Sequence, residues 1–246
     1  MSSLKTNQEI FMSPWGLPDS LQWINYVNAW INSGMSVYAT NSVIISLFAL
    51  FLTISTGSMA AYVLSRFKFK GNKICMMLFI SGLAIPIELL AIPIYIMFIN
   101  LNLVNTRFGL IMVYTAVGLP FTIFILAGFM RTIPHEIEEA ATIDGCAHWG
   151  IYWHIILPLS MPGIISVSIF NFLRVWNEYF LALLLITDDA KMPLSLGLYN
   201  LQVSSQNACE WGTLFAGAVI VIIPTLLVYV ILRNRITSGL TVGALK

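Results

Sequence analysis

Charged side chains are scarce in this sequence. Asp, Glu, Lys and Arg make up 9% of the 246 residues, whereas soluble domains carry about 25%. So few charges cannot cover a globular surface in water, and hydrophobic residues account for 58% of the chain. The net charge of +1 also excludes a protein that binds nucleic acid through a basic face. The composition therefore indicates a surface that faces membrane lipid.

Cysteine and histidine are too few and too scattered for a metal centre. Cys75, Cys146 and Cys209 lie far apart without CxxC spacing, and the three histidines have no spacing that suits a metal ion. We therefore expect no disulfide framework, metal site or bound cofactor. The sequence also contains no nucleophile–base set and no HExxH motif, so we expect that the chain is not an enzyme.

Long hydrophobic runs dominate the remainder of the chain. Crossing a bilayer takes roughly 20 apolar residues, and five runs are long enough, at approximately 41–64, 74–99, 108–130, 161–186 and 213–233. They predict an all-α, polytopic transmembrane helical bundle forming one membrane domain over 41–246. Residues 1–40 contain no complete span and form a separate N-terminal segment, in which three tryptophans favour an interfacial cap.

The orientation follows from the basic residues in the connections, because Lys and Arg accumulate on the cytoplasmic side. Three basic residues fall on one side, namely Lys5, Arg107 and Lys191. Eight fall on the other, namely Arg66, Lys68, Lys70, Lys73, Arg131, Arg233, Arg235 and Lys246. This pattern predicts a cytoplasmic 131–160 segment, an outer N-terminal segment and an outer 187–212 connector.

A polar stretch, EEAATIDGCAHWGIYWHIILPLSMPG at 138–163, interrupts the hydrophobic runs. We expect a short helix over 134–144, with Pro134 at its first position and Gly145 as a left-handed stop. A second short helix over 147–156 is expected to end at Leu157-Pro158. Such a segment, tied to a span at each end, suits a docking handle, and an ordinary interfacial loop is the alternative.

This stretch resembles the EAA motif of ABC-importer permeases, E-A-A-x3-G-x9-I-x-L-P. Glu139-Ala140-Ala141, Gly145, Ile155 and Leu157-Pro158 fill its fixed positions at the right spacing. The segments LQWINYVNAW, YVLSRFKFKG and RVWNEYFLALLLI also resemble carbohydrate importer permeases of the maltose, MalG-like type. The resemblance implies the type I importer (MetI-like) transmembrane fold. That family normally has six helices, so its first helix is expected to be missing here.

The resemblance further implies a permease subunit of an ATP-driven, binding-protein-dependent sugar importer in the cell membrane. Its partners would be ABC ATPase subunits, which bind ATP and magnesium, a second, MalF-like permease and an extracytoplasmic sugar-binding protein. The residues expected to couple the chain to the ATPase are Glu138, Glu139, Ala140, Ala141, Asp144, Gly145, Ile155, Leu157 and Pro158.

Polar residues within the expected spans are candidates for the substrate path. At 100° per residue, Asn171, Arg174, Asn177 and Glu178 fall on one face of the fourth span. They form either a polar wall of a sugar path, with Trp176 or Tyr179 available for stacking, or a structural pair facing the partner permease. Glu88 lies between Pro86 and Pro93, where we expect a kink, and either lines the path or bonds freed backbone groups.

An ion- or proton-coupled secondary transporter is the alternative function. Glu88, Arg174 and Glu178 would then form its proton relay. Such folds often carry an internal repeat, which we do not find in this sequence. The complete EAA pattern also favours the importer.

Overall fold

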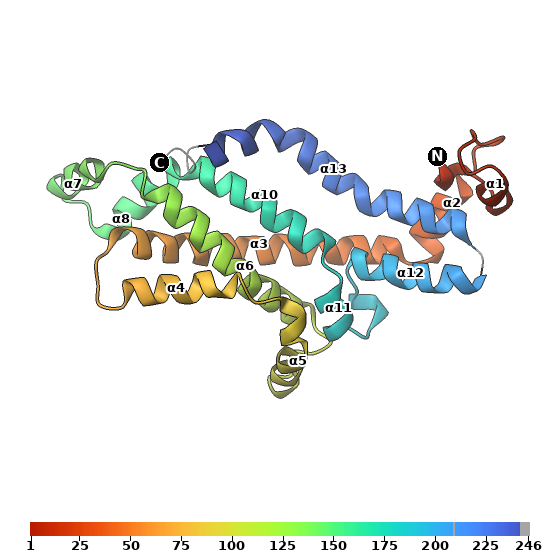
Figure 1. Cartoon of the computed structure of the whole chain (residues 1–246), viewed down its shortest axis with the longest axis horizontal. Coiled ribbons are helices and arrows are strands. Elements are labelled where there is room, and N and C mark those ends of the chain that lie inside the picture. Colours follow the sequence, from red (N-terminus) through yellow and green to blue (C-terminus); the bar gives the residue numbers. More distant parts are fainter. Residues whose placement is uncertain (209, 242–246) are drawn as a thin grey trace. The chain divides into compact units, whose positions relative to one another are not determined.

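A computed structural model describes residues 1–208 and 210–241, and all regular structure in these residues is helical (Figure 1). Among the described residues, three helices are long and apolar enough to cross a membrane: α3 (Met35–Arg66), α6 (Arg107–Met130) and the first part of α13 (Trp211–Thr241). Counting each of two bent helix pairs as one span raises the number to as many as five, the number expected from the sequence, although the second pair covers 148–177 rather than the expected 161–186. The expected basic residues Arg233, Arg235 and Lys246 lie outside the part whose side chains are described.

The second span is interrupted where its prolines predict. Helix α4 (Asn72–Gly82) ends before Pro86, a 3-10 turn covers Ile87–Leu90, and α5 (Ala91–Asn100) follows. Proline removes one backbone donor and restricts the residue before it, so Ile85 cannot continue a regular helix. Pro93 is tolerated because it lies in the first turn of α5, where its missing N–H has no intrahelical acceptor.

The polar stretch enters the fourth span through a sharp bend that its sequence does not predict. Helix α8 (His148–Ile151), a π-helical turn (Tyr152–Ile156) and α9 (Leu157–Leu159) run into α10 (Met161–Asn177) with a bend of 73°. The expected helix end at Leu157-Pro158 is wrong. Pro158 follows the π-helical turn, in which the Leu157 N–H donates to the Tyr152 carbonyl, and the chain stays helical up to Leu159.

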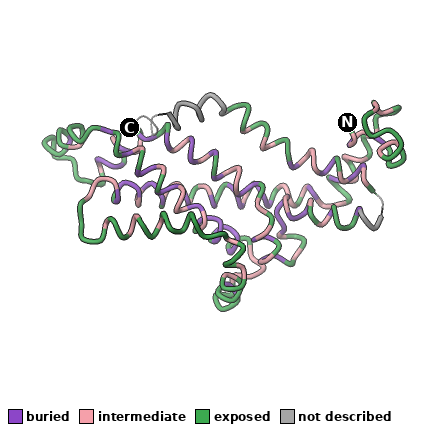
Figure 2. The backbone as a smooth tube through the Cα atoms, in the orientation of Figure 1, coloured by how far each residue is buried: buried purple, intermediate pink, exposed green. Residues whose placement is uncertain are grey.

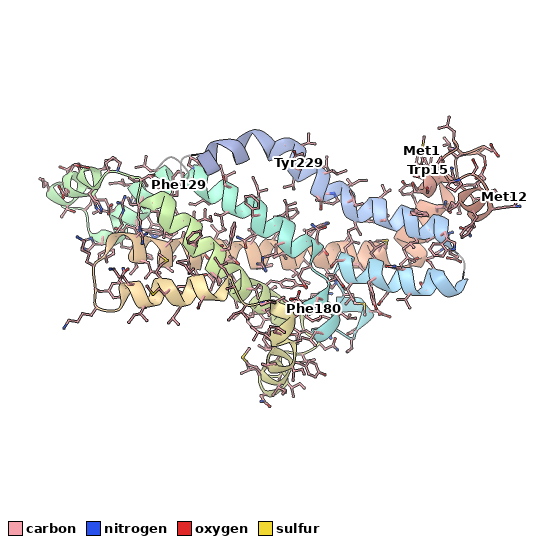
Figure 3. All side chains as sticks on the ribbon, in the orientation of Figure 1. Met1, Met12, Trp15, Phe129, Phe180 and Tyr229 are labelled. Atoms are coloured by element: carbon pink, nitrogen blue, oxygen red, sulfur yellow. The ribbon has the colours of Figure 1, made fainter. Side chains whose placement is uncertain are left out.

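The chain divides into two compact units. The first comprises 1–47, 91–111 and 174–230, and the second comprises 48–90, 112–173 and 231–246. The first unit contains α1 (Asn7–Met12), α2 (Ile24–Val27), α5, α11 (Phe180–Leu185), α12 (Leu194–Ala208) and most of α13. Its N-terminal segment exposes Trp15 at 96% and Met12 at 77%, both labelled in Figure 3.

Helix α12 corrects the expectation of a plain connector over 187–212. The buried Asn41 amide holds the start of this segment by donating to the Ala190 carbonyl at 3.0 Å and the Met192 carbonyl at 2.9 Å. Ser42 accepts from the Leu194 backbone N–H at 2.7 Å. These two side chains of α3 satisfy backbone groups at the α12 N-terminus and thereby fix where the helix begins.

The second unit is built on a hydrophobic core to which the polar stretch contributes part of its side chains. Its centre consists of side chains from α3, α6 and the bent fourth span, including Ala61, Leu126, Met130, Tyr152 and Ile156. In Figure 2 the tube is buried along parts of these helices and mostly exposed along α7 (His135–Ile143). The polar stretch is therefore anchored on one side and open on the other.

Candidate functional site

Helix α7 (His135–Ile143) matches the short helix expected in the polar stretch. Pro134 is its N-cap, with φ −57° and ψ 137°, rather than its first helical residue as expected. Proline restricts its predecessor to extended conformations, so the helix begins only after the turn at 131–134. Glu136 and Glu138 lie in the first turn, where negative charge complements the helix dipole.

The end of α7 is fixed by a Schellman motif at Gly145. Its φ of +85° is the expected left-handed conformation. The Gly145 N–H donates to the Thr142 carbonyl at 3.0 Å, and the Cys146 N–H donates to the Ala141 carbonyl at 2.9 Å. These two bonds satisfy carbonyl groups of the last turn of α7 and end the helix.

Arg66, the last residue of α3, holds α7 against the core. Its Nε lies 2.7 Å from Glu138 Oε1, and the two side chains are 2% and 14% exposed. The same guanidinium donates to the Ile133 carbonyl at 2.8 Å. Tyr62, one turn earlier on α3, donates its hydroxyl to the other Glu138 oxygen at 3.5 Å. Sequence reasoning counted Arg66 only as a cytoplasmic charge, because its partners lie far away in the sequence.

A second hydrogen bond ties the other arm of the segment to α3. Ser58 and Tyr152 share a buried bond of 2.8 Å between their hydroxyl oxygens. Tyr152 lies in the π-helical turn and packs its ring against Tyr62 at 5.3 Å. The polar stretch is therefore held to α3 at both ends, in addition to its covalent links to α6 and α10.

The expected coupling residues divide into an inward and an outward set. Ala141 is buried in the core, Glu138 faces Arg66, and Ile155 and Leu157 pack against the core. The outward set consists of Glu139, Ala140, Asp144, Gly145 and Pro158, all of which are exposed. Ile143 at the end of α7 is 86% exposed, more than any other described large apolar side chain except Trp15, and nothing in its local sequence marks it.

The expected polar stripe of the fourth span is not a single helix face. Helix α10 ends at Asn177, so Glu178 lies beyond it and does not share the expected helix face with Asn171 and Arg174. The Glu178 carboxylate instead accepts from the Leu181 N–H at 2.8 Å, at the start of α11. Arg174 is half-buried and Asn177 is exposed. Glu88 is exposed in the 3-10 turn.

Asn171 of the stripe and the neighbouring Trp176 both hydrogen-bond to other helices. Asn171 is 2% exposed and donates to Thr122 on α6 at 2.9 Å. Trp176 is buried, and its Nε1–H donates to the Val221 carbonyl of α13 at 3.1 Å. Of the two aromatic residues considered for stacking, only Tyr179 is therefore accessible, at 47% exposure.

Comparison with known proteins identifies the family. The profile of the binding-protein-dependent transport system inner membrane component family matches residues 53–238, which include the whole polar stretch and the bent fourth span. The chain belongs to this family. It is accordingly a membrane-embedded permease subunit and a transport component rather than an enzyme, and the secondary-transporter alternative is set aside.

Several relatives of this permease are similar over its full length. It is 40% identical to the diacetylchitobiose uptake system permease protein NgcG of Streptomyces coelicolor, covering 100% of this chain and 82% of the relative. It is 33% identical to the probable starch degradation products transport system permease protein AmyC of Thermoanaerobacterium thermosulfurigenes, covering 100% and 89%.

Solved structures confirm the expected fold. A bacterial ABC transporter that imports the acidic polysaccharide alginate matches with a TM-score of 0.83 and 20% identity, covering 95% of this permease and 86% of that chain. The same kind of transporter in complex with its pentasaccharide-bound periplasmic protein matches with a TM-score of 0.64 and 18% identity, covering 94% and 87%. At this identity the match shows the fold alone.

Proposed function

We propose that this permease forms the translocation path of a sugar importer together with a second permease, and that α7 docks into a cytoplasmic ABC ATPase. The relatives named for diacetylchitobiose and for starch degradation products support a carbohydrate substrate. ATP and magnesium would bind to the ATPase subunits. An extracytoplasmic binding protein would deliver the sugar.

The observation that carries the docking role is the asymmetric burial of α7. An ordinary interfacial loop has no need for a buried arginine–glutamate pair beneath it and an 86% exposed isoleucine at its end. Ala140 and Gly145 leave room for close approach, and the exposed Glu139 and Asp144 offer carboxylates to basic groups of the ATPase.

The attachment of the segment explains how docking could drive transport. A displacement of α7 acts on α3 through Arg66 and Glu138, and a displacement of the π-helical turn acts on α3 through Tyr152 and Ser58. Both contacts are buried and directional. ATP-driven movement of the ATPase would therefore shift α3 together with the helices that the segment connects covalently.

Co-purification tests this proposal. The tagged wild-type chain, extracted gently from native membranes, is expected to bring an ABC ATPase and a second permease, identified by mass spectrometry. Ile143→Asp is expected to lose most of the ATPase and keep the second permease, because the substitution places a charge on the exposed apolar end of α7. Glu136→Gln, an exposed change on the same helix, is the matched control. Equal ATPase recovery from all three proteins would contradict docking through α7.

Accessibility labelling tests the proposed orientation. In a background with Cys75, Cys146 and Cys209 replaced by serine, single cysteines are introduced at Asp189 or Ala147, both of which are exposed. A membrane-impermeant thiol reagent is expected to label Asp189→Cys in intact cells. Ala147→Cys should react only after permeabilisation, and labelling of both positions from one side would refute the topology.

A further inference from the structure

The first unit contains a pocket of about 520 Å³ whose lining combines two tyrosines with amide and hydroxyl groups. It is bordered by the end of α10, by one face of α12 and by α13. Its polar lining residues are Asn177, Tyr179, Ser195, Tyr199 and Gln202. The pocket falls within the range of about 300–1,000 Å³ that is usual for small-molecule sites.

One helix provides half of this lining in a regular pattern. Ser195, Leu198, Tyr199 and Gln202 on α12 all line the pocket. Their spacing of i, i+3, i+4 and i+7 places them on a single helix face. Leu194, Leu196 and Leu201, by contrast, are buried at 7% exposure or less. The polar face of α12 is therefore turned to the pocket while other residues of the helix pack into the unit.

The two tyrosines form a stacked pair at the pocket. The rings of Tyr179 and Tyr199 are 5.9 Å apart between centroids, and the angle between their planes is 25°. Both side chains remain accessible, at 47% and 39% exposure. Aromatic rings presented in this way offer an apolar surface with a polar hydroxyl at its edge. Such a surface suits a ligand with one apolar face and a hydroxyl-rich rim.

The walls of the pocket are held in place independently of any ligand. The Ser195 hydroxyl donates to the Glu178 carbonyl, which fixes α12 against the turn between α10 and α11. The indole of Trp176 donates to the Val221 carbonyl, which fixes α10 against α13. Leu201 and Leu198 also pack closely on Gly217 of α13. A pre-organised pocket binds its ligand without a large ordering cost.

The lining of the pocket contains no Asp, Glu, Lys or Arg among the described residues. An ionised ligand would lose its hydration there without gaining a counter-charge from the lining. Amide groups, by contrast, both donate and accept hydrogen bonds, as sugar hydroxyls do. Leu198, Val221 and Ile222 add apolar surface beside the tyrosines.

We infer that this pocket is a binding subsite for an uncharged pyranose unit. The sugar ring stacks on Tyr179 or Tyr199, while Asn177 and Gln202 bind its hydroxyls. This inference rests on the proposed function, and it adds a location and a charge preference for the substrate. It also gives this chain its own contact with the transported sugar, separate from any contact with the second permease.

Thiol protection in the complete transporter tests the subsite directly. Gln202→Cys is prepared in the cysteine-free background and reconstituted with the ATPase, the second permease and the binding protein. Its reaction with a small thiol reagent is followed without sugar, with maltose or N,N′-diacetylchitobiose, and with a mannuronate disaccharide. We expect the neutral sugars to slow the reaction by about tenfold, the free-energy equivalent of one good contact, and the acidic sugar to leave it unchanged. Asn32→Cys, which is exposed but does not line the pocket, is the control.

Transport by tyrosine variants provides the second measurement. Tyr199→Ala is expected to lower sugar uptake at saturating binding protein about tenfold, as the loss of one aromatic contact would. Stimulated ATP hydrolysis should change by less than about twofold, and Tyr199→Phe should restore most of the uptake because it keeps the ring.

The outcomes separate the subsite from the general proposal. If wild-type transporter takes up none of the sugars, the sugar-importer function fails, and the subsite fails with it. If uptake is normal but no sugar protects Gln202→Cys and Tyr199→Ala transports like wild type, only the subsite is overturned. Protection by the acidic sugar alone would overturn the preference for an uncharged ligand.

Discussion

Replacing Arg66 with alanine is expected to lower sugar uptake by at least about tenfold while the protein still inserts into the membrane. The Glu138 side chain is only 14% exposed and would lose the cation that neutralises it. The Ile133 carbonyl would also lose its hydrogen-bond donor. Removing one partner of a buried ion pair typically costs about 3–5 kcal/mol. Because this pair holds α7 on the core, the loss should detach the segment. The measurement is uptake together with ATP hydrolysis in reconstituted transporter.

Two comparisons make this prediction specific. Arg131→Ala removes an exposed arginine at the end of α6 and should have little effect. The double variant Arg66→Met with Glu138→Leu should be less damaging than either single change, because no charge is left buried without a partner. If Arg66→Ala behaves like Arg131→Ala, the ion pair does not support coupling.

Substituting Gly145 with valine is expected to uncouple ATP hydrolysis from uptake, with uptake falling roughly tenfold. A left-handed conformation costs an L-residue about 1–2 kcal/mol, and β-branched residues tolerate it least. At φ +85° the valine would weaken the bonds that close α7. Gly145→Asn should keep more activity, because asparagine adopts this conformation more readily. Uptake and ATP hydrolysis are measured in the same vesicles.

The control for this series is Gly150→Ala. A Cβ at Gly150 meets no atom within 4 Å, and the same holds at Gly145, but only Gly145 has a positive φ. Any difference between the two sites therefore reports backbone conformation or contact with a partner. If Gly145→Asn loses as much activity as Gly145→Val, close approach of the ATPase, rather than the turn itself, requires the glycine.

The features that could be predicted from the sequence depend on local chemistry. The five apolar runs, the interruption near Pro86 and the left-handed stop at Gly145 each follow from residues that are close together in the chain. Helix α7 was placed within one residue at either end for the same reason. Local signals also mark where the coupling segment lies, although not how it is held.

The features that were missed depend on contacts between distant residues. Arg66 acquires its role only when the end of α3 meets α7. Helix α12 contains Gly197, which leaves room for the ring of Tyr38, a residue far away in the sequence. Helix α10 likewise ends at Asn177, and the carboxylate of the next residue, Glu178, accepts a hydrogen bond from the Leu181 N–H at the start of α11. Helical periodicity cannot reveal any of these partners.

The two buried links between α3 and the polar stretch have a consequence for building chimaeric transporters. Replacing residues 131–160 with the segment of another permease would remove Glu138 and Tyr152 and leave their partners Arg66 and Ser58 on α3. Ser58, Tyr62 and Arg66 lie on three successive turns of α3. They would have to be exchanged together with the segment. Exchanging these three positions together with the segment should preserve its contacts with α3. Exchanging the segment alone would pair its residues with α3 side chains that do not match them.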